Sequence, residues 1–300
     1  MKSRGRRRVR APAPPAGAPA ASRERSHPLE RLRSAQTEMV RLAGAPDPTP
    51  EQLHRFHRRL RRLRIEIRLA RSLQPPSGQA VARAVDRRLR RLSGLVGEVR
   101  DFDVSLGILG TSHGASAPDP SREAFERTRR RLREEARSGR ALLGASLRAE
   151  IDSGLLREAS ALLEKVGPKL SGPAALGWMR TAIVRQRRRV DRSLRKARRR
   201  PTTRRMHRLR GALRRAHHLV DLAPPTTVPP FPSRLARLQR ELGRLHDLDV
   251  VADGLEGLGD GAEGAEWIER IERRRRALRR EIVTELGRRA LRERVREIGT

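Results

Sequence analysis

The chain has 300 residues, enough for one large or two ordinary domains, and 36% of them are hydrophobic. It carries 70 Lys and Arg against 35 Asp and Glu, a formal net charge of +35 at pH 7. Because a folded surface of this charge repels itself, we expect a negatively charged partner. Nearly all the cations are Arg, whose planar guanidinium binds phosphate through two parallel hydrogen bonds. A GC-rich genome would also raise Arg over Lys, so composition favours phosphate without deciding for it.

The scarce residue types exclude other classes of protein. With four Phe, two Trp and no Tyr, the chain offers few platforms on which the bases of single-stranded nucleic acid could stack. The absence of Cys excludes disulfides and thiolate metal sites and is compatible with the cytosol. No apolar run approaches the roughly 20 residues of a membrane span. We therefore expect a soluble, cytoplasmic protein with no membrane partner.

In chain order, the first segment is a basic, Pro- and Ala-rich stretch, residues 1–26, which we interpret as a disordered tail. After it, helical periodicity alternates with Pro-rich breakers, and no β-type alternation appears. The pattern predicts an all-α protein. Helices are expected at residues 28–43, 50–73, 79–110, 121–149, 154–166, 174–200, 202–222, 233–258 and 263–298.

An internal repeat determines the expected architecture. Residues 53–70 align without gaps on residues 206–223, with seven of eighteen positions identical. Residues 89–104 align on residues 235–250, with seven of sixteen identical. Two blocks in the same order indicate a duplicated unit of four main helices, and thus two four-helix bundles related by a pseudo-two-fold axis.

The repeat also predicts the domain organisation. The first helical-bundle repeat should comprise residues 27–150 and the second residues 174–300, with a linker helix in residues 151–173. The glycines at equivalent places in the two copies, Gly97 and Gly243, favour close helix packing over a phosphate-binding loop, because no Gly-rich loop surrounds them.

The first repeated helix carries a cationic stripe beside its apolar face. Apolar residues from Leu53 to Ile67 recur at steps of three and four, the pattern of a face that packs on a core. One position onward the same steps hold His54, His57, Arg61, Arg64 and Arg68. The second copy holds His207, Arg210, Arg214 and His217, and Asp221 closes the row. At about 1.5 Å per residue each stripe spans roughly 20 Å, which suits a long anion.

The alternative is that the stripe is only the solvated face of an Arg-rich helix. His beside Arg at the same place in both copies argues against this, because a neutral imidazole adds little to a solvated charged face. Its repetition favours a role in hydrogen bonding or packing.

These residues resemble a family. His54, with Arg61, Arg62 and Arg64 following, and GEVRDFDV at 97–104 resemble the CHAD domain, the conserved histidine α-helical domain. His207, Arg210, Arg214 and Arg215, with GRLHDLDV at 243–250, are similar to its other repeat. The resemblance covers about residues 27–298. It implies two four-helix bundles that enclose a basic groove, binding of inorganic polyphosphate there, and association with polyphosphate granules.

The sequence departs from the family pattern at two positions. His57 and His217 stand where the family has Arg, and each replaces a permanent cation by a group largely neutral at pH 7. No triphosphate-tunnel domain precedes the helices, so we expect a stand-alone CHAD protein without the enzymatic role that such a neighbour would bring.

The expected function is therefore non-catalytic binding of polyphosphate, with no catalytic residue, metal or cofactor. The expected binding residues are His54, His57, Arg61, Arg62, Arg64, Arg68, His207, Arg210, Arg214 and Arg215. Four acids are expected to pair with neighbouring Arg and hold the guanidinium groups in position: Asp101, Asp103, Asp247 and Asp249.

Two alternatives stay open, as does the oligomeric state. A nucleic-acid packaging protein would need little beyond the net charge, and weak non-specific nucleic-acid binding is expected in any case. A metal-dependent phosphohydrolase could use His246 and Asp247, but the other copy has Arg100 and Asp101 there, and further converging ligands are not evident.

Overall fold

The computed structural model describes residues 28–112, 119–169, 172–223, 228–256 and 265–299, and the predicted tail lies outside these ranges. The described residues form α-helices, one short 3-10 helix and no strand, which confirms the prediction of an all-α protein. The helices are α1 (Pro28–Gly44), α2 (Pro50–Leu73), α3 (Pro76–Ser112), α4 (Asp119–Asp152), α5 (Leu155–Val166), α6 (Pro173–Arg199), α7 (Thr203–Leu222), α8 (Ser233–Glu256), α9 (Ala265–Gly287) and α10 (Arg289–Arg296), with the 3-10 helix at Gly167–Lys169.

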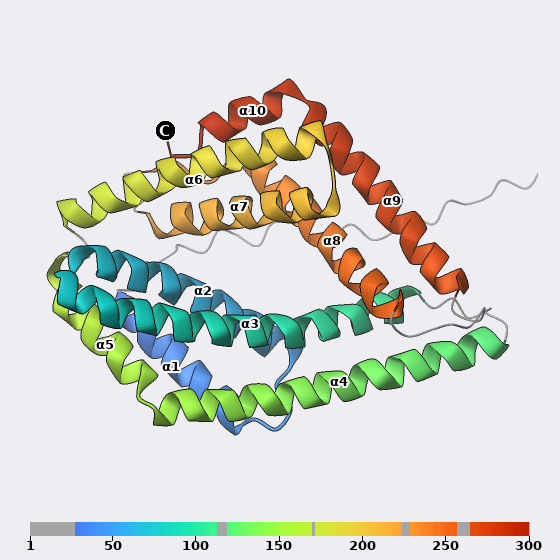
Figure 1. The fold of residues 1–300 in the computed structure, drawn as a ribbon, viewed down its shortest axis with the longest axis horizontal. Helices are drawn as coiled ribbons and strands as arrows, with labels where there is room; N and C mark the ends of the chain where they lie inside the picture. The colour runs from blue at the N-terminus through green and yellow to red at the C-terminus, as the bar shows by residue number, and fades with distance from the viewer. Residues whose placement is uncertain (1–27, 113–118, 170–171, 224–227, 257–264, 300) are drawn as a thin grey trace, which may run out of the picture.

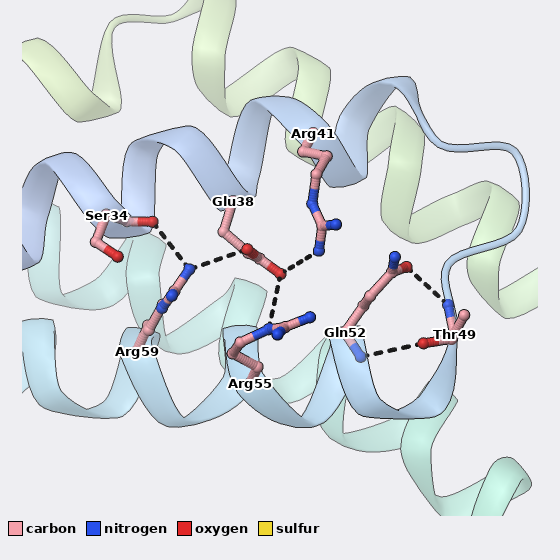
Figure 2. Close-up of polar contacts among 7 residues, drawn as sticks. All are labelled: Ser34, Glu38, Arg41, Thr49, Gln52, Arg55 and Arg59. Carbon is pink, nitrogen blue, oxygen red and sulfur yellow. Dashed lines mark hydrogen bonds and ion pairs between the residues drawn. The ribbon is translucent and has the colours of Figure 1, made fainter. Parts of the chain in front are cut away.

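Helices α2 and α7, which carry the repeated cationic stripes, begin at equivalent threonines. The Thr49 side chain accepts a hydrogen bond from the Gln52 amide, and the Gln52 side chain accepts one from the Thr49 amide (Figure 2). At the start of α7, Thr202 accepts from the amide of Arg205. Each cap satisfies a backbone donor that the first helical turn leaves unpaired, and so fixes where the stripe begins.

The prediction of one helix over residues 263–298 is wrong. Helix α9 ends at Gly287, the backbone of Arg288 is extended, and α10 starts at Arg289. Gly is a poor helix former, and the break lets α10 turn back so that Leu291 and Val295 enter a buried core. The apolar periodicity of the sequence continues from α9 into α10 because both helices have an apolar face, so the pattern gave no sign of the break.

Two large apolar cores divide the helices by their order in the chain. Helices α1 to α5 surround the first core, and α6 to α10 surround the second. Leu155, Ala159 and Leu163 of α5 are fully buried in the first core, so the segment predicted as a linker helix packs within that half. A smaller cluster, with Leu109, Leu132, Leu248 and Ile271, joins the far ends of α3, α4, α8 and α9.

The two halves meet along α2 and α3 of the first half and α6, α7 and α8 of the second. Helix α3 packs against α8, and α2 packs against α6 and α7. In Figure 1, α6 and α7 lie above α2 and α3, while α4 and α5 lie below them. This arrangement brings the stripes of α2 and α7 toward the boundary between the halves. None of the described helices is long and apolar enough to cross a membrane.

A buried carboxylate fixes α1 against α2. The side chain of Glu38 is only 8% exposed and pairs with Arg41 at 2.7 Å, Arg59 at 2.9 Å and Arg55 at 3.6 Å. Arg59 also donates to the Ser34 carbonyl at 3.2 Å (Figure 2). We call this set of contacts between α1 and α2 the seam. Because its three guanidinium groups come from both helices, the seam sets the rotation of α2, and with it the direction of the cationic stripe.

Candidate functional site

Four arginines from both halves converge at the boundary between the cores. We call them the central cluster: Arg61 of α2, Arg100 of α3, and Arg210 and Arg214 of α7. Burial, followed by the charges of Arg214, Arg100 and Arg210, lowers the pKa of Arg61 to about 9. Burial and then Arg210, Arg215 and Arg100 lower the pKa of Arg214 to about 10. Burial and the charges of neighbouring arginines both disfavour the charged form, so the four arginines are partly desolvated and close together.

Two of the predicted acids lie in this cluster. Asp101 and Asp247 both act on Arg210 and Arg100, favouring their charged forms. Burial raises the pKa of each carboxyl group, and the attraction of Arg210 is the largest opposing influence on both. Two carboxylates against four arginines leave positive charge in excess.

The other two predicted acids hold helices together. Asp103 binds Arg140 of α4, and Asp249 binds Arg275 of α9 with an Nε to Oδ1 distance of 2.9 Å. Asp103 and Asp249 occupy equivalent positions of the repeat, and each joins the second repeated helix to the helix that follows it. Their partners could not be identified from the sequence because α4 and α9 lie outside the aligned blocks.

His57 and Arg100 explain one departure from the family pattern. The His57 side chain is buried, and an Arg100 Nη1 lies 3.2 Å from its Nδ1. Burial and then the charges of Arg61 and Arg100 lower the pKa of His57 to about 2, so the ring is neutral and its Nδ1 accepts from Arg100. In the second half the residue types are exchanged: Arg210 stands on α7 and His246 on α8.

Each half therefore contributes one Arg and one His at these two positions. Sequence reasoning noted that Arg100 stands opposite His246 but left it out of the binding set. The exchange of Arg and His between the two copies was the signal that could have found it. Arg100 places a guanidinium group beside His57. The first half therefore keeps a cation near the position where the family has Arg.

The remaining predicted histidines surround the cluster. His54 and His207 are exposed. Burial, then the charges of Arg100 and other neighbours, lowers the pKa of His54. The His207 ring packs edge-on against His246, with centroids 4.8 Å apart. Burial and then Arg210 lower the pKa of His246 to about 4, so this imidazole is neutral near pH 7.

Two predicted stripe residues are bound to a carboxylate. Arg64 and Arg68 each direct Nε at Asp86 of α3, at 2.9 and 3.0 Å. Asp86 precedes the aligned block, and the position equivalent to it in the second copy is Pro232. The repeat therefore gave no sign of this acid, which pairs with both arginines, although the charge of Arg64 still acts on Arg61 of the cluster.

The last two predicted arginines, Arg62 and Arg215, are largely exposed at the margin of the cluster. Burial and then the charges of Arg189 and Arg68 lower the pKa of Arg215. Arg189 belongs to α6, a helix that sequence reasoning did not connect with the site. The margin therefore includes three helices rather than the two repeated ones.

A pocket of about 470 Å³ lies beside the cluster at the start of α2. Its lining includes His54, the cations Arg55, Arg58 and Arg100, and the acids Glu51 and Asp103. Sequence reasoning omitted Arg58, although its position four residues after His54 places both side chains on one helix face. The pocket extends the basic region from the cluster toward the surface.

His217, the second departure from the family pattern, packs against other side chains of the second half. Its Nδ1 lies 3.2 Å from the side-chain oxygen of Gln239, and its ring stacks on Phe231 with centroids 4.7 Å apart. The adjacent His218 has no hydrogen-bond partner at either ring nitrogen among the described residues. Burial and then the charge of Arg61 lower the pKa of His218 to about 3, so it borders the cluster as a neutral ring.

The described residues contain no group of three or more His, Cys, Asp or Glu with the geometry of a metal site. The equivalent glycines lie where repeated helices pack together: Gly97 of α3 faces α2, and Gly243 of α8 faces α7. A Cβ on Gly97 would lie 3.6 Å from Cε1 of His57, and one on Gly243 would lie 3.9 Å from Nε of Arg210. At both positions the neighbour is therefore a side chain of the adjacent helix, His57 in one half and the cluster residue Arg210 in the other.

Fold and site define an all-helical protein in which two halves of the chain share one cluster of partly buried arginines. The sequence matches the family model of the CHAD domain over residues 28–256, and the chain belongs to that family. The family is associated in general with binding of polyphosphate or triphosphate. A search of curated proteins found no match.

A crystal structure of the CHAD domain from the plant Ricinus communis is similar to this chain, with a TM-score of 0.65 at 21% sequence identity. The alignment covers 90% of this chain and 89% of that one. At this identity the likeness shows a shared fold.

Proposed function

We propose that this protein binds inorganic polyphosphate at the central cluster and does not hydrolyse it. The observation that carries the proposal is the convergence of Arg61 and Arg214, from equivalent places in the repeat, with Arg100 and Arg210. Four guanidinium groups share the cluster with two carboxylates, so a polyanion would supply the missing negative charge. Arg binds phosphate oxygens in pairs, and neutral histidines can donate further hydrogen bonds.

We also infer that the site arose from an internal duplication that gave two bundles about a pseudo-two-fold axis. Each half has four main helices and one shorter helix, α5 or α10, in the same order. Equivalent positions have equivalent roles: Thr49 and Thr202 begin α2 and α7, while Asp103 and Asp249 bind the following helix. A linear anion with repeating charge is a suitable ligand for such a site, because both halves can bind the same chemical group.

Absence of hydrolysis is part of the proposal, because the acids and histidines of the cluster have arginine partners or neutral packing roles. If Asp101 or Asp247 were catalytic, purified protein with a divalent metal would release orthophosphate steadily, and Asp101→Asn or Asp247→Asn would abolish the release. We expect no release above that of a heat-inactivated sample. In a cell we expect the protein in the cytoplasm at polyphosphate granules, which a fluorescent fusion would test.

Simultaneous replacement of Arg61, Arg62, Arg214 and Arg215 by Ala tests the binding site. Hydrogen bonds to charged groups contribute about 1.5 to 3 kcal/mol each, so the variant should bind polyphosphate at least about a hundredfold more weakly even if part of that energy is lost. Affinity is measured by titration calorimetry, and circular dichroism must show that the variant is still helical.

A control with the same change in charge separates the site from net charge. The control variant replaces Arg4, Arg6, Arg7 and Arg8 by Ala and should lose far less polyphosphate affinity. Both variants should lose weak duplex-DNA affinity to a similar extent, because non-specific binding follows total charge. Equal loss of polyphosphate affinity in both variants would mean that diffuse charge holds the anion.

Competition distinguishes this function from nucleic-acid packaging. At about 0.15 M salt, where exposed charges are screened beyond roughly 8 Å, wild-type protein should retain polyphosphate against excess duplex DNA. Displacement of polyphosphate by DNA would favour a packaging role instead.

A further inference from the structure

Helix α6 carries a second row of cations, outside the central cluster. The α6 stripe consists of six exposed residues: Arg185, Arg188, Arg189, Arg192, Lys196 and Arg199. At 100° per residue they lie on one face of the helix, over about 21 Å of its length. The opposite face, which includes Ile183, Val190 and Leu194, is buried in the second core. The stripe therefore faces away from the core.

No carboxylate in the part of the chain that the structure describes pairs with the α6 stripe. Among the described residues, none of its six members forms an ion pair, and the nearest acid in sequence, Asp191, pairs with Arg195 at 2.9 Å. On other Arg-rich helices, exposed arginines form ion pairs within the helix. On α4, Arg131 pairs with Glu135, and on α9, Arg273 pairs with Glu269. Arginines without an ion pair in the described part of the chain also occur on α4, at Arg130, Arg133 and Arg137, whereas the α6 stripe places six such cations on one face.

Positive charge is continuous from the central cluster to the α6 stripe. Arg214 of the cluster is close enough to Arg215 for the charge of Arg215 to lower its pKa. Arg215 in turn has Arg189 of the stripe and Arg68 of α2 as its strongest charged neighbours. Helix α6 also packs against both α7 and α2. A chain of phosphates that leaves the cluster beside Arg215 would meet Arg189 next.

We propose that the α6 stripe is a second polyphosphate-binding surface, which holds the part of a long chain that extends beyond the central cluster. The inference rests on the proposed function. A single line of cations along one helix matches a ligand whose charges also lie in one line, whereas a nucleic-acid duplex presents charge on two strands. The stripe makes affinity depend on chain length, because only a long chain can occupy both surfaces at once.

The test compares two triple variants with two ligands. The stripe variant is Arg185→Gln, Arg188→Gln and Arg192→Gln, which leaves Arg189 beside the cluster. The matched control is Arg130→Gln, Arg133→Gln and Arg137→Gln on α4, also exposed and without ion pairs among the described residues. Helices α4 and α6 lie on opposite sides of the molecule (Figure 1). The ligands are tripolyphosphate and a polyphosphate of many tens of units.

Exposed charge interactions contribute about 0.2 to 1 kcal/mol each, so three lost arginines should weaken long-chain binding by about tenfold. Tripolyphosphate binding should change less than about twofold, and the α4 variant should change less than about threefold with either ligand. Equal long-chain losses in the two variants would overturn the inference. Failure of wild-type protein to bind either ligand would instead refute the proposed function, so the two failures are distinguishable.

Discussion

The seam around Glu38 and the central cluster use the same residue types in opposite ways. In the seam, one carboxylate that is 8% exposed receives three guanidinium groups from α1 and α2 (Figure 2). In the cluster, Arg61 and Arg214 lie among other arginines, and repulsion adds to burial in lowering the pKa of both. The first region is a centre of attraction between two helices. The second contains uncompensated positive charge.

The difference shows how an Arg-rich chain can fold and still keep a binding site. Carboxylates in the seam, such as Glu38, and at α3, such as Asp86, hold the helices that carry the cations. Few carboxylates reach the cluster, and its charges oppose folding until an anion arrives. A change in the seam should therefore alter stability and leave affinity nearly unchanged, whereas loss of a cluster arginine should raise stability and lower affinity.

The largest effect on folding is expected for Glu38→Gln. Removal of one partner from a buried pair costs about 3 to 5 kcal/mol, but the arginines here are partly exposed, so we expect a loss of about 2 to 3 kcal/mol in the free energy of unfolding. Urea denaturation measures it. Polyphosphate affinity should remain within about twofold, because Glu38 does not contact the cluster.

Glu134→Gln is the matched control, since Glu134 is exposed on α4 and forms no ion pair among the described residues. Its change in stability should be below about 0.5 kcal/mol. Equal destabilisation by the two substitutions would show that the seam contributes only net charge.

Sequence periodicity predicted much of the fold because its signals are local. The apolar steps of α2 and α7 placed Arg61 and Arg214 at the boundary of a buried face, and both meet in the cluster. The residues that were missed depend on contacts between distant segments. Arg100 reaches His57 across 43 positions, and Asp86 reaches Arg64 across 22. No spacing rule within one helix connects such pairs, so periodicity could not show that Arg64 is paired with Asp86.

Arg61→Met should change stability and affinity in opposite directions. Without ligand, the substitution removes a repelled, partly buried charge and fills the space with an apolar chain, so the free energy of unfolding should rise by about 1 kcal/mol. Polyphosphate affinity should fall about tenfold, since one charge-assisted contact is lost. Thermal melts with and without polyphosphate measure both effects. A variant that is destabilised without ligand would contradict the view that the cluster opposes folding.

His57→Gln should reduce the pH dependence of stability in the free protein. Burial and the charges of Arg61, Arg100 and Arg214 lower the folded-state pKa of His57 to about 2, whereas the unfolded chain protonates near 6.5. Stability from the neutral ring is present above pH 6.5 and is lost as pH falls below it, with a slope of up to about 1.4 kcal/mol per pH unit.

The Gln variant lacks this group, so its stability should fall less steeply, by about 1 kcal/mol per unit, between about pH 6.5 and pH 5. Urea denaturation at several pH values measures both proteins. Burial raises the pKa of Glu66 to about 7 and adds an opposing trend, but Glu66 is present in both, so the comparison cancels it. Parallel curves would show that His57 does not titrate differently in the folded and unfolded states.

The smallest effects are expected at the two glycines that border the cluster. In Gly97→Ala the new Cβ would meet Cε1 of His57 at 3.6 Å, and in Gly243→Ala it would meet Nε of Arg210 at 3.9 Å, both ordinary contacts. Ala is favoured over Gly within helices by up to about 1 kcal/mol, so each variant should gain about 0.5 kcal/mol in stability. Affinity should stay within about twofold because His57 and Arg210 keep their positions.

Substitution of the same glycines by Leu tests whether the ligand binds the cluster side chains or approaches the glycine backbone. A Leu side chain at residue 97 would displace His57 and thereby Arg100, and at residue 243 it would displace Arg210. Overpacking costs about 1 to 3 kcal/mol, and we expect both Leu variants to lose polyphosphate affinity at least about tenfold while they remain folded. If Ala weakened binding as much as Leu does, the ligand would have to approach the glycine backbone itself. The cluster side chains would then be neighbours of the binding surface rather than the groups that form it.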